Sequence, residues 1–180
     1  MNVVECSLSW EVVMGKIAVY PGSFDPITFG HADIVGRALE CFDGVIVAIA
    51  ADSQKNVLFT VEERIEMARV ALREKPDVVV ESFRGLLVDY VARTKATVIL
   101  RGLRATSDFD YEFHMASTNK NLNENVETLF MMASKDFFFV SSRTIKEVAS
   151  LDGCVKGLVP ECVERKLKER FAAIRKKDQK

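Results

Sequence analysis

Two short segments of the chain carry side chains that are suited to phosphate chemistry. The first, PGSFDPITFGH, places the hydroxyl of Ser23 ahead of His31, which stands at a predicted helix start. Free backbone N–H groups and the helix dipole favour an anion at such a start. The second, RGLR at 101–104, holds two guanidinium groups that can donate paired hydrogen bonds to phosphate oxygens. A histidine that only bonds its own helix start, and arginines paired with Asp108 and Asp110, remain open structural alternatives.

The surrounding pattern predicts an α/β fold. Short β-branched runs alternate with stretches of helical period, which indicates βαβ units and a parallel sheet. The runs are apolar throughout, as expected of strands that helices cover on both faces. We predict strands over 17–20, 45–50, 78–81, 97–100 and 126–131, and helices over 30–41, 62–72, 86–94, 108–122, from 141 or 142 to 150, and from 160 to about 175. The fold class is therefore a Rossmann-like, doubly wound parallel five-stranded sheet with helices on both faces and a C-terminal helical segment.

This fold would bring the two segments together. Ligands of doubly wound sheets bind outside the carboxyl ends of the strands, where the strand order reverses. With the order 3-2-1-4-5, the segments after Tyr20 and after Leu100 should face each other. Gly22 permits a close backbone approach or a positive φ, and Gly102 lets the backbone turn between the two arginines. Lys55, in the loop after the second strand, lies on the same edge, so we expect one anion site there.

Composition excludes several classes of protein. The 180 residues suit one domain, and their 48% hydrophobic and 28% charged residues argue against disorder, collagen and coiled coil. With 25 basic and 26 acidic residues, the net charge of −1 does not favour nucleic-acid binding through bulk charge. The sequence has no apolar run of about 18 residues or more, so no membrane span is expected.

The N-terminal segment and the cysteines favour a cytoplasmic protein. Residues 1–13 show no period, no cap and no basic start, so we expect an extension outside the fold rather than a secretory signal. They are a natural extension, a segment before the true initiator Met14, or vector residues. The single domain then spans 14–180. None of the four cysteines forms a Cys-x-x-Cys pair, so free thiols are expected rather than a zinc site.

Three motifs resemble a known family. YPGSFDPITFGH is similar to the signature of the HxGH/TxGH nucleotidyltransferase superfamily, with Thr28-Phe29-Gly30-His31 in the T-x-G-H place. RGLRATSDFDYE and FFFVSSRTIKEVA resemble segments of the bacterial phosphopantetheine adenylyltransferases, and the match runs from about residue 16 to about residue 171. The RTxGIST-like string of cytidylyltransferases is absent from the sequence.

The resemblance implies a reaction in coenzyme A biosynthesis. ATP and 4′-phosphopantetheine would give dephospho-coenzyme A and pyrophosphate, with Mg²⁺ held through the ATP phosphates rather than by protein ligands. It also implies a homohexamer and possible feedback binding of coenzyme A, with no nucleic-acid or membrane partner. Two alternatives stay open: another adenylyltransferase, such as one acting on nicotinate mononucleotide, or a non-catalytic adenine-nucleotide-binding module.

Family roles carry over to matching positions of this sequence. The catalytic residues implied are Ser23, His31, Lys55 and Arg101. Those implied to bind the acceptor substrate are Ser23, Lys55, Leu87 and Arg101. Those implied to bind ATP are Ser23, Phe24, His31, Gly102, Leu103, Arg104, Glu112, Phe137, Phe138, Phe139, Val140, Ser141, Ser142 and Arg143. The serine pair could equally cap a helix, and the three phenylalanines could belong to the core.

Two positions depart from the family pattern. Ser23 stands where many members have threonine, and both residues supply a hydroxyl. Arg143 follows the serine pair where a small or polar residue is common. The extra cation would either tighten ATP binding or alter feedback, and the sequence favours neither.

The residues permit a reaction without a general base. A phosphate monoester has a second pKa of about 6, so the acceptor is already mostly dianionic near neutrality. We therefore expect direct in-line attack with no covalent intermediate, driven by positioning and charge neutralisation. In this scheme Ser23, Lys55 and Arg101 hold the nucleophile, a neutral His31 meets charge on the α-phosphate, and the segment 141–143 meets the leaving pyrophosphate.

Overall fold

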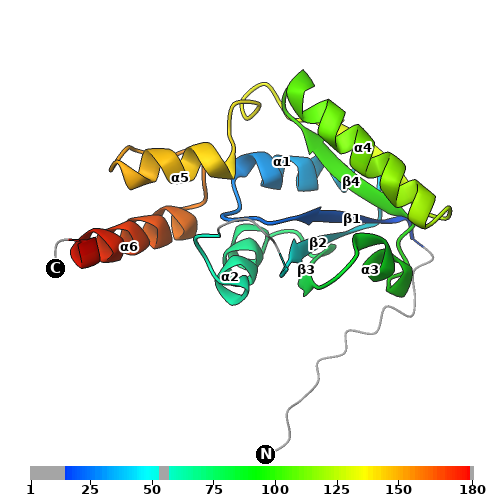
Figure 1. Ribbon diagram of the computed structural model, residues 1–180, viewed down its shortest axis with the longest axis horizontal. Coiled ribbons are helices and arrows are strands. Elements are labelled where there is room, and N and C mark those ends of the chain that lie inside the picture. The colour runs from blue at the N-terminus through cyan, green and yellow to red at the C-terminus, as the bar shows by residue number, and fades with distance from the viewer. Residues whose placement is uncertain (1–14, 53–56, 179–180) are drawn as a thin grey trace, which may run out of the picture.

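A computed structural model describes residues 15–52 and 57–178 of the chain (Figure 1). Lys55 and the predicted extension over 1–13 lie outside the described residues. Strands and helices alternate up to the last two elements, as the apolar pattern predicted. Their bounds are β1 (Ile17–Gly22), α1 (Phe29–Ala38), β2 (Gly44–Ala50), α2 (Val61–Ala71), β3 (Val78–Phe83), α3 (Leu87–Arg93), β4 (Val98–Leu103), α4 (Thr106–Leu122), β5 (Glu127–Met132), α5 (Ser142–Ser150) and α6 (Glu161–Asp178).

The five strands form one parallel sheet in the order β3-β2-β1-β4-β5, which confirms the predicted topology. β1 pairs with β2 along its whole length, from Ile17 to Gly22. Its pairing with β4 covers only Ala18 and Val19. The two central strands therefore separate toward their carboxyl ends, where the strand order reverses and a ligand crevice is expected.

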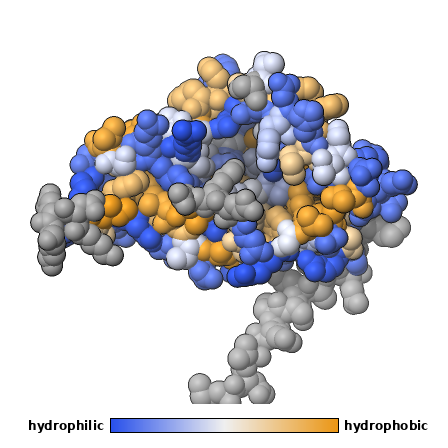
Figure 2. Space-filling model, in the orientation of Figure 1, coloured by the Kyte–Doolittle hydropathy of each residue, from blue (hydrophilic) through white to orange (hydrophobic). Residues whose placement is uncertain are grey.

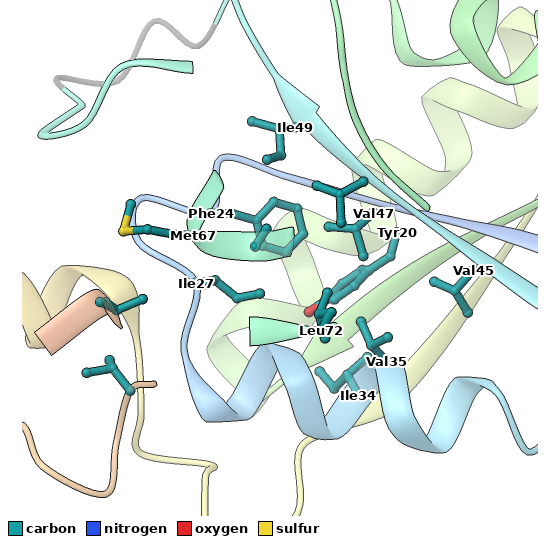
Figure 3. Packing of buried hydrophobic residues seen from close by; sticks show 14 of the residues in the cluster. Tyr20, Phe24, Ile27, Ile34, Val35, Val45, Val47, Ile49, Met67 and Leu72 are labelled. Atoms are coloured by element: carbon teal, nitrogen blue, oxygen red, sulfur yellow. The ribbon is translucent and has the colours of Figure 1, made fainter. Parts of the chain in front are cut away.

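Helices cover both faces of the sheet. On one face α1 and α2 pack on side chains from β1 and β2, and the larger core continues into α5 and α6. Tyr20, Phe24 and Ile27 carry this core from β1 into the following turn, above Ile34 and Val35 of α1 (Figure 3). On the other face α3 supplies buried side chains, and α4 contacts β4 and β5.

Three helix starts follow from capping residues. Thr28 caps α1 in a capping box with His31, and Thr60 caps α2 in the predicted box with Glu63. Ser141 is the residue that caps α5, since its hydroxyl accepts from the N–H of Thr144 at 2.9 Å. These caps place the starts of α1 and α5 beside the crevice.

The fourth strand corrects one prediction. β4 was expected to end at residue 100 with a turn at Gly102, but it continues to Leu103 because it stays in register with β5 as far as Met132. Gly102 is required for close packing instead of a turn. A Cβ at this position would lie 2.4 Å from Cδ1 of Ile34 and 3.2 Å from the hydroxyl of Tyr20.

None of the helices in the part of the chain that the structure describes combines the length and the apolar character needed to cross a membrane.

Candidate active site

Two adjoining cavities occupy the crevice at the carboxyl ends of β1 and β4. The larger, of about 380 Å³, lies between the start of α1, the start of α5 and β4. The smaller, of about 240 Å³, lies between α4, α3 and the ends of β1 and β2. The space-filling view shows a hollow in this face of the molecule, beside α4 (Figure 2). The two cavities share the lining residues Pro21, Gly22, Ser23, Arg101 and Glu112.

His31 lies in the larger cavity with its ring held by its own helix start. Its Nδ1 accepts a hydrogen bond from the backbone N–H of Thr28 at 3.0 Å. The ring edge meets the ring of Phe24, with centroids 5.1 Å apart, and Tyr20 lies beyond. The residue is therefore both a structural member of the capping box and a wall of the cavity, so the two alternatives for it are compatible.

Burial and the hydrogen bond at Nδ1 together define the protonation state of His31. Burial, followed by the nearby charge of Arg104, lowers the pKa of His31 to about 4, so the ring is neutral near pH 7. Because Nδ1 accepts a backbone hydrogen bond, the single ring proton must reside on Nε2. The imidazole therefore offers a neutral N–H donor to the cavity.

Arg101 stands between the two cavities and is held on both sides. It binds Glu112 through two hydrogen bonds, from Nε at 2.6 Å and from Nη2 at 2.5 Å. Its Nη1 donates to the carbonyl of Pro21 at 2.9 Å, across the gap between β4 and β1. Burial acts to lower the pKa of Arg101, but the hydrogen bonds and charge of Glu112 outweigh it and the pKa is raised. The guanidinium is thus a fixed cation at the junction.

Arg104 forms the ion pair that the structural alternative predicted. Its Nε lies 3.1 Å from Oδ2 of Asp108, in the first turn of α4. The predicted alternative is wrong for Arg101, whose carboxylate partner is Glu112 and not Asp110. The reason lies in the helix: Glu112 lies one turn after Asp108, on the same side of α4. Both arginines still line the larger cavity.

The serine pair serves two structural roles at the cavity. Ser141 caps α5, and the hydroxyl of Ser142 donates to the carbonyl of Pro26 at 2.7 Å. Together with exposed Arg143 they line the larger cavity, where the start of α5 adds its own partial positive charge.

The remaining predicted residues divide into two groups. Phe24, Gly102, Phe137 and Val140 line the larger cavity, and Leu87 lines the smaller one. Three others line neither cavity: Leu103, which is buried, and Phe138 and Phe139, which are each 56% exposed.

Asp25, Lys146 and Asn119 are among the polar lining residues that the sequence interpretation missed. Asp25, 2% exposed, accepts hydrogen bonds from the backbone N–H groups of Leu58 and Phe59, and its Oδ2 lies 2.5 Å from Nζ of Lys146. Asn119 of α4, 8% exposed, lines the smaller cavity. No local pattern distinguished Asp25, since its partners Leu58, Phe59 and Lys146 lie far along the chain.

The described residues contain no protein metal cage. Among 15–52 and 57–178 there is no group of three or more His, Cys, Asp and Glu side chains placed to hold an ion. The carboxylates of Asp25 and Glu112 in the larger cavity are already paired with cations. Cys41, Cys154 and Cys162 are free thiols, as predicted, and Cys6 lies outside the described residues.

Comparisons with known proteins agree with this geometry. Residues 19–148 match the family model described as cytidylyltransferase-like, so the fold and its crevice are those of a nucleotidyltransferase. Proteins named phosphopantetheine adenylyltransferase are similar over most of the chain. That of Geobacter sulfurreducens is 55% identical over 157 residues, which is 87% of this chain and 96% of that protein. Those of Carboxydothermus hydrogenoformans and Syntrophus aciditrophicus are 56% and 55% identical, over 87% and 91% of this chain and 96% and 99% of their own length.

The chain therefore belongs to the phosphopantetheine adenylyltransferase family. This confirms the resemblance inferred from the three sequence motifs.

Proposed function

We propose that the protein transfers the adenylyl group of ATP to 4′-phosphopantetheine, giving dephospho-coenzyme A and pyrophosphate. The observation that carries the proposal is the pair of cavities joined at Ser23 and Arg101. An adenylyl transfer needs a site for a nucleoside triphosphate beside a site for a second substrate. The phosphates of the two substrates must meet at one point. The larger cavity suits the nucleotide because it is rich in cations and helix N–H groups.

The smaller cavity suits the pantetheine arm. Leu87, Phe83 and Met115 give it apolar walls, and the side-chain amide of Asn119 lies among them. A chain of methylene and amide groups matches such a lining, because its apolar parts need burial and its amides need polar partners.

The acceptor phosphate would sit at the junction of the cavities. Its second pKa of about 6 leaves it mostly dianionic at neutral pH, so no group has to remove a proton. Arg101 would bind this phosphate through its remaining N–H groups, and the hydroxyl of Ser23 would donate to it. Lys55, which lies outside the described residues, is proposed as the third contact on the grounds of sequence alone.

His31 would act on the α-phosphate. Its Nε2–H is neutral and fixed in direction by the bond that Thr28 donates to Nδ1. In-line displacement places extra charge on the α-phosphate oxygens in the transition state, and a preorganised donor lowers that barrier. Arg104 and the segment 141–143 would meet the β- and γ-phosphates that leave as pyrophosphate.

Mg²⁺ would enter with ATP, bound by the phosphates. Bound there, the ion would neutralise charge on the leaving pyrophosphate. The larger cavity fits a metal ion bound by the ATP phosphates, because most of the charged side chains that line the cavity are cations. These cations can face the phosphate oxygens.

The test is pyrophosphate release with ATP and each candidate acceptor. We expect release with 4′-phosphopantetheine and none with nicotinate mononucleotide. Release with nicotinate mononucleotide alone would instead support the other adenylyltransferase. Calorimetric ATP binding without release from any acceptor would support a nucleotide-binding module.

Assembly, regulation and location are also proposals. We propose a cytoplasmic homohexamer that coenzyme A inhibits by competing for the acceptor cavity. Sedimentation velocity should give a species near six times the chain mass of 20.2 kDa, and a lone 20.2 kDa species at micromolar concentration would contradict it.

A further inference from the structure

A buried cation lies behind the Ser23 turn. Arg64 of α2 is 1% exposed and lines neither cavity. Its Nη1 donates to the carbonyl of Ser23 at 2.7 Å and to that of Ala50 at 3.1 Å, and its Nε donates to that of Thr60 at 3.3 Å. Burial lowers the pKa of Arg64, and the charge of Asp25 opposes this effect. One side chain thus ties the ends of β1 and β2 to the start of α2.

The Ser23 carbonyl belongs to the same peptide unit as the N–H of Phe24. A trans peptide is planar, and its C=O and N–H point in opposite directions. Since the carbonyl points at Arg64, behind the turn, the N–H points toward the cavity that Phe24 lines. Within residues 15–52 and 57–178 this N–H has no hydrogen-bond partner. It is therefore a donor available to a phosphate oxygen.

Phe24 needs support to keep this orientation. Its φ of 45° lies in the left-handed region, which a bulky L-residue rarely adopts. Such a conformation persists only where the surroundings hold it. The Phe24 ring packs against Tyr20 at 5.4 Å between centroids, and Arg64 holds the preceding carbonyl.

Stability alone is a poor explanation for a buried arginine. The desolvation of a buried charge often outweighs its attraction to partners, and an apolar side chain of similar length is commonly as stable. We propose that Arg64 is a positioning residue, which orients the Ser23–Phe24 peptide so that the Phe24 N–H meets a substrate phosphate. This inference rests on the proposed adenylyl transfer, although Arg64 itself touches no substrate.

The test compares Arg64→Met and Arg64→Lys with the wild type. We expect Arg64→Met to lower kcat by about 10²-fold, because displacement of a positioning group by about 1 Å has that effect. Arg64→Lys, which keeps the charge but offers one nitrogen in place of three, should lie between Arg64→Met and wild type. Calorimetric ATP affinity should fall much less than kcat in both, since Arg104 and the segment 141–143 still bind the nucleotide. Amide hydrogen exchange over 20–28, measured without substrates, should become faster.

A matched control is available on the same helix. Arg69 donates from Nη2 to the carbonyl of Val80 at 3.2 Å, away from both cavities. Arg69→Met should leave kcat and the exchange over 20–28 unchanged.

Two results would overturn the inference: a kcat within twofold of wild type in Arg64→Met, or a lowered kcat with unchanged exchange over 20–28. If Arg64→Met does not fold, the same two criteria apply to Arg64→Lys. If the wild type itself releases no pyrophosphate with 4′-phosphopantetheine, the proposed function fails, and the exchange data still decide the role of Arg64.

Discussion

The backbone N–H of Thr28 decides what His31 can do. By donating to Nδ1 it leaves the ring proton on Nε2, and the lowered pKa of about 4 keeps the ring neutral. A neutral donor lowers the energy of a charged transition state without holding the product phosphates as strongly as a cation would. His31 is thus suited to stabilising the transition state of adenylyl transfer rather than to binding ATP.

His31→Ala should lower kcat and kcat/KM by similar factors, about 10²-fold, because it removes one donor used mainly in the transition state. ATP affinity measured by calorimetry should change little. Since this variant also breaks the capping box, His31→Asn is the sharper test: its side-chain oxygen can accept from Thr28, but it places no donor where Nε2 lies. His114→Ala on α4 is the control. Near-normal kcat in His31→Asn would make His31 a capping residue only.

Arg104→Ala should act on ground-state binding. Loss of a charge-assisted hydrogen bond to a phosphate corresponds to about 1.5–3 kcal/mol, so KM for ATP should rise roughly ten- to a hundredfold. The KM for 4′-phosphopantetheine and kcat should change much less. Steady-state kinetics with both substrates varied would separate these effects, and a loss confined to kcat would contradict the assignment.

The pKa of His31 also makes stability depend on pH. The unfolded chain protonates this residue near pH 6.5 and the folded chain near pH 4, so in that window the unfolded state binds more protons. The stabilisation is complete above pH 6.5 and is lost as the pH falls to about 4, by up to about 3 kcal/mol. Denaturant titrations should show a flatter pH profile for His31→Asn than for wild type. A profile that this substitution leaves unaltered would contradict the buried neutral state.

At the scale of elements, Gly102 sets the distance between β4 and α1. An added Cβ would lie 2.4 Å from Cδ1 of Ile34, which is 4% exposed and packed in the core. Gly102→Ala should therefore destabilise the fold by about 1–3 kcal/mol. Ile34→Val removes the clashing methyl, so the double variant should recover part of that loss in thermal unfolding.

Gly44→Ala serves as the comparison for that experiment. Its added Cβ would meet the carbonyl of Asp77 at 3.5 Å, an ordinary contact, and stability should change little. If Gly102→Ala and Gly44→Ala unfold alike, and Ile34→Val gives no recovery, close packing of β4 on α1 is not what Gly102 provides.

At the scale of the whole molecule, we propose that residues 14–180 are the functional domain. Among the residues that the structure describes, those that form the sheet and line both cavities begin at Ile17. A chain that starts at Met14 should keep its melting temperature within about 2 °C and its turnover within twofold. A large drop in either would mean that the first 13 residues dock on the domain.

Much of the fold could be read from the sequence because its signals are local. Apolar periodicity and capping pairs such as Thr60 with Glu63 involve residues three or four positions apart, so they predict element types and most boundaries. The order of strands and helices then predicts the parallel sheet and the crevice at its switch point. The positions of Ser23, His31 and Arg101 at one site followed from that rule.

The tertiary structure alone decided how these residues are held. Glu112 rather than Asp110 pairs with Arg101, and Gly102 lies inside a strand whose length depends on its pairing with β5. In the sequence, Arg64 is one of many charged residues on an amphipathic helix. The fold buries it against the carbonyl of Ser23, 41 residues away. Such partners meet only when the sheet closes, because a hydrogen bond depends on distance in space and leaves no periodic trace in the chain.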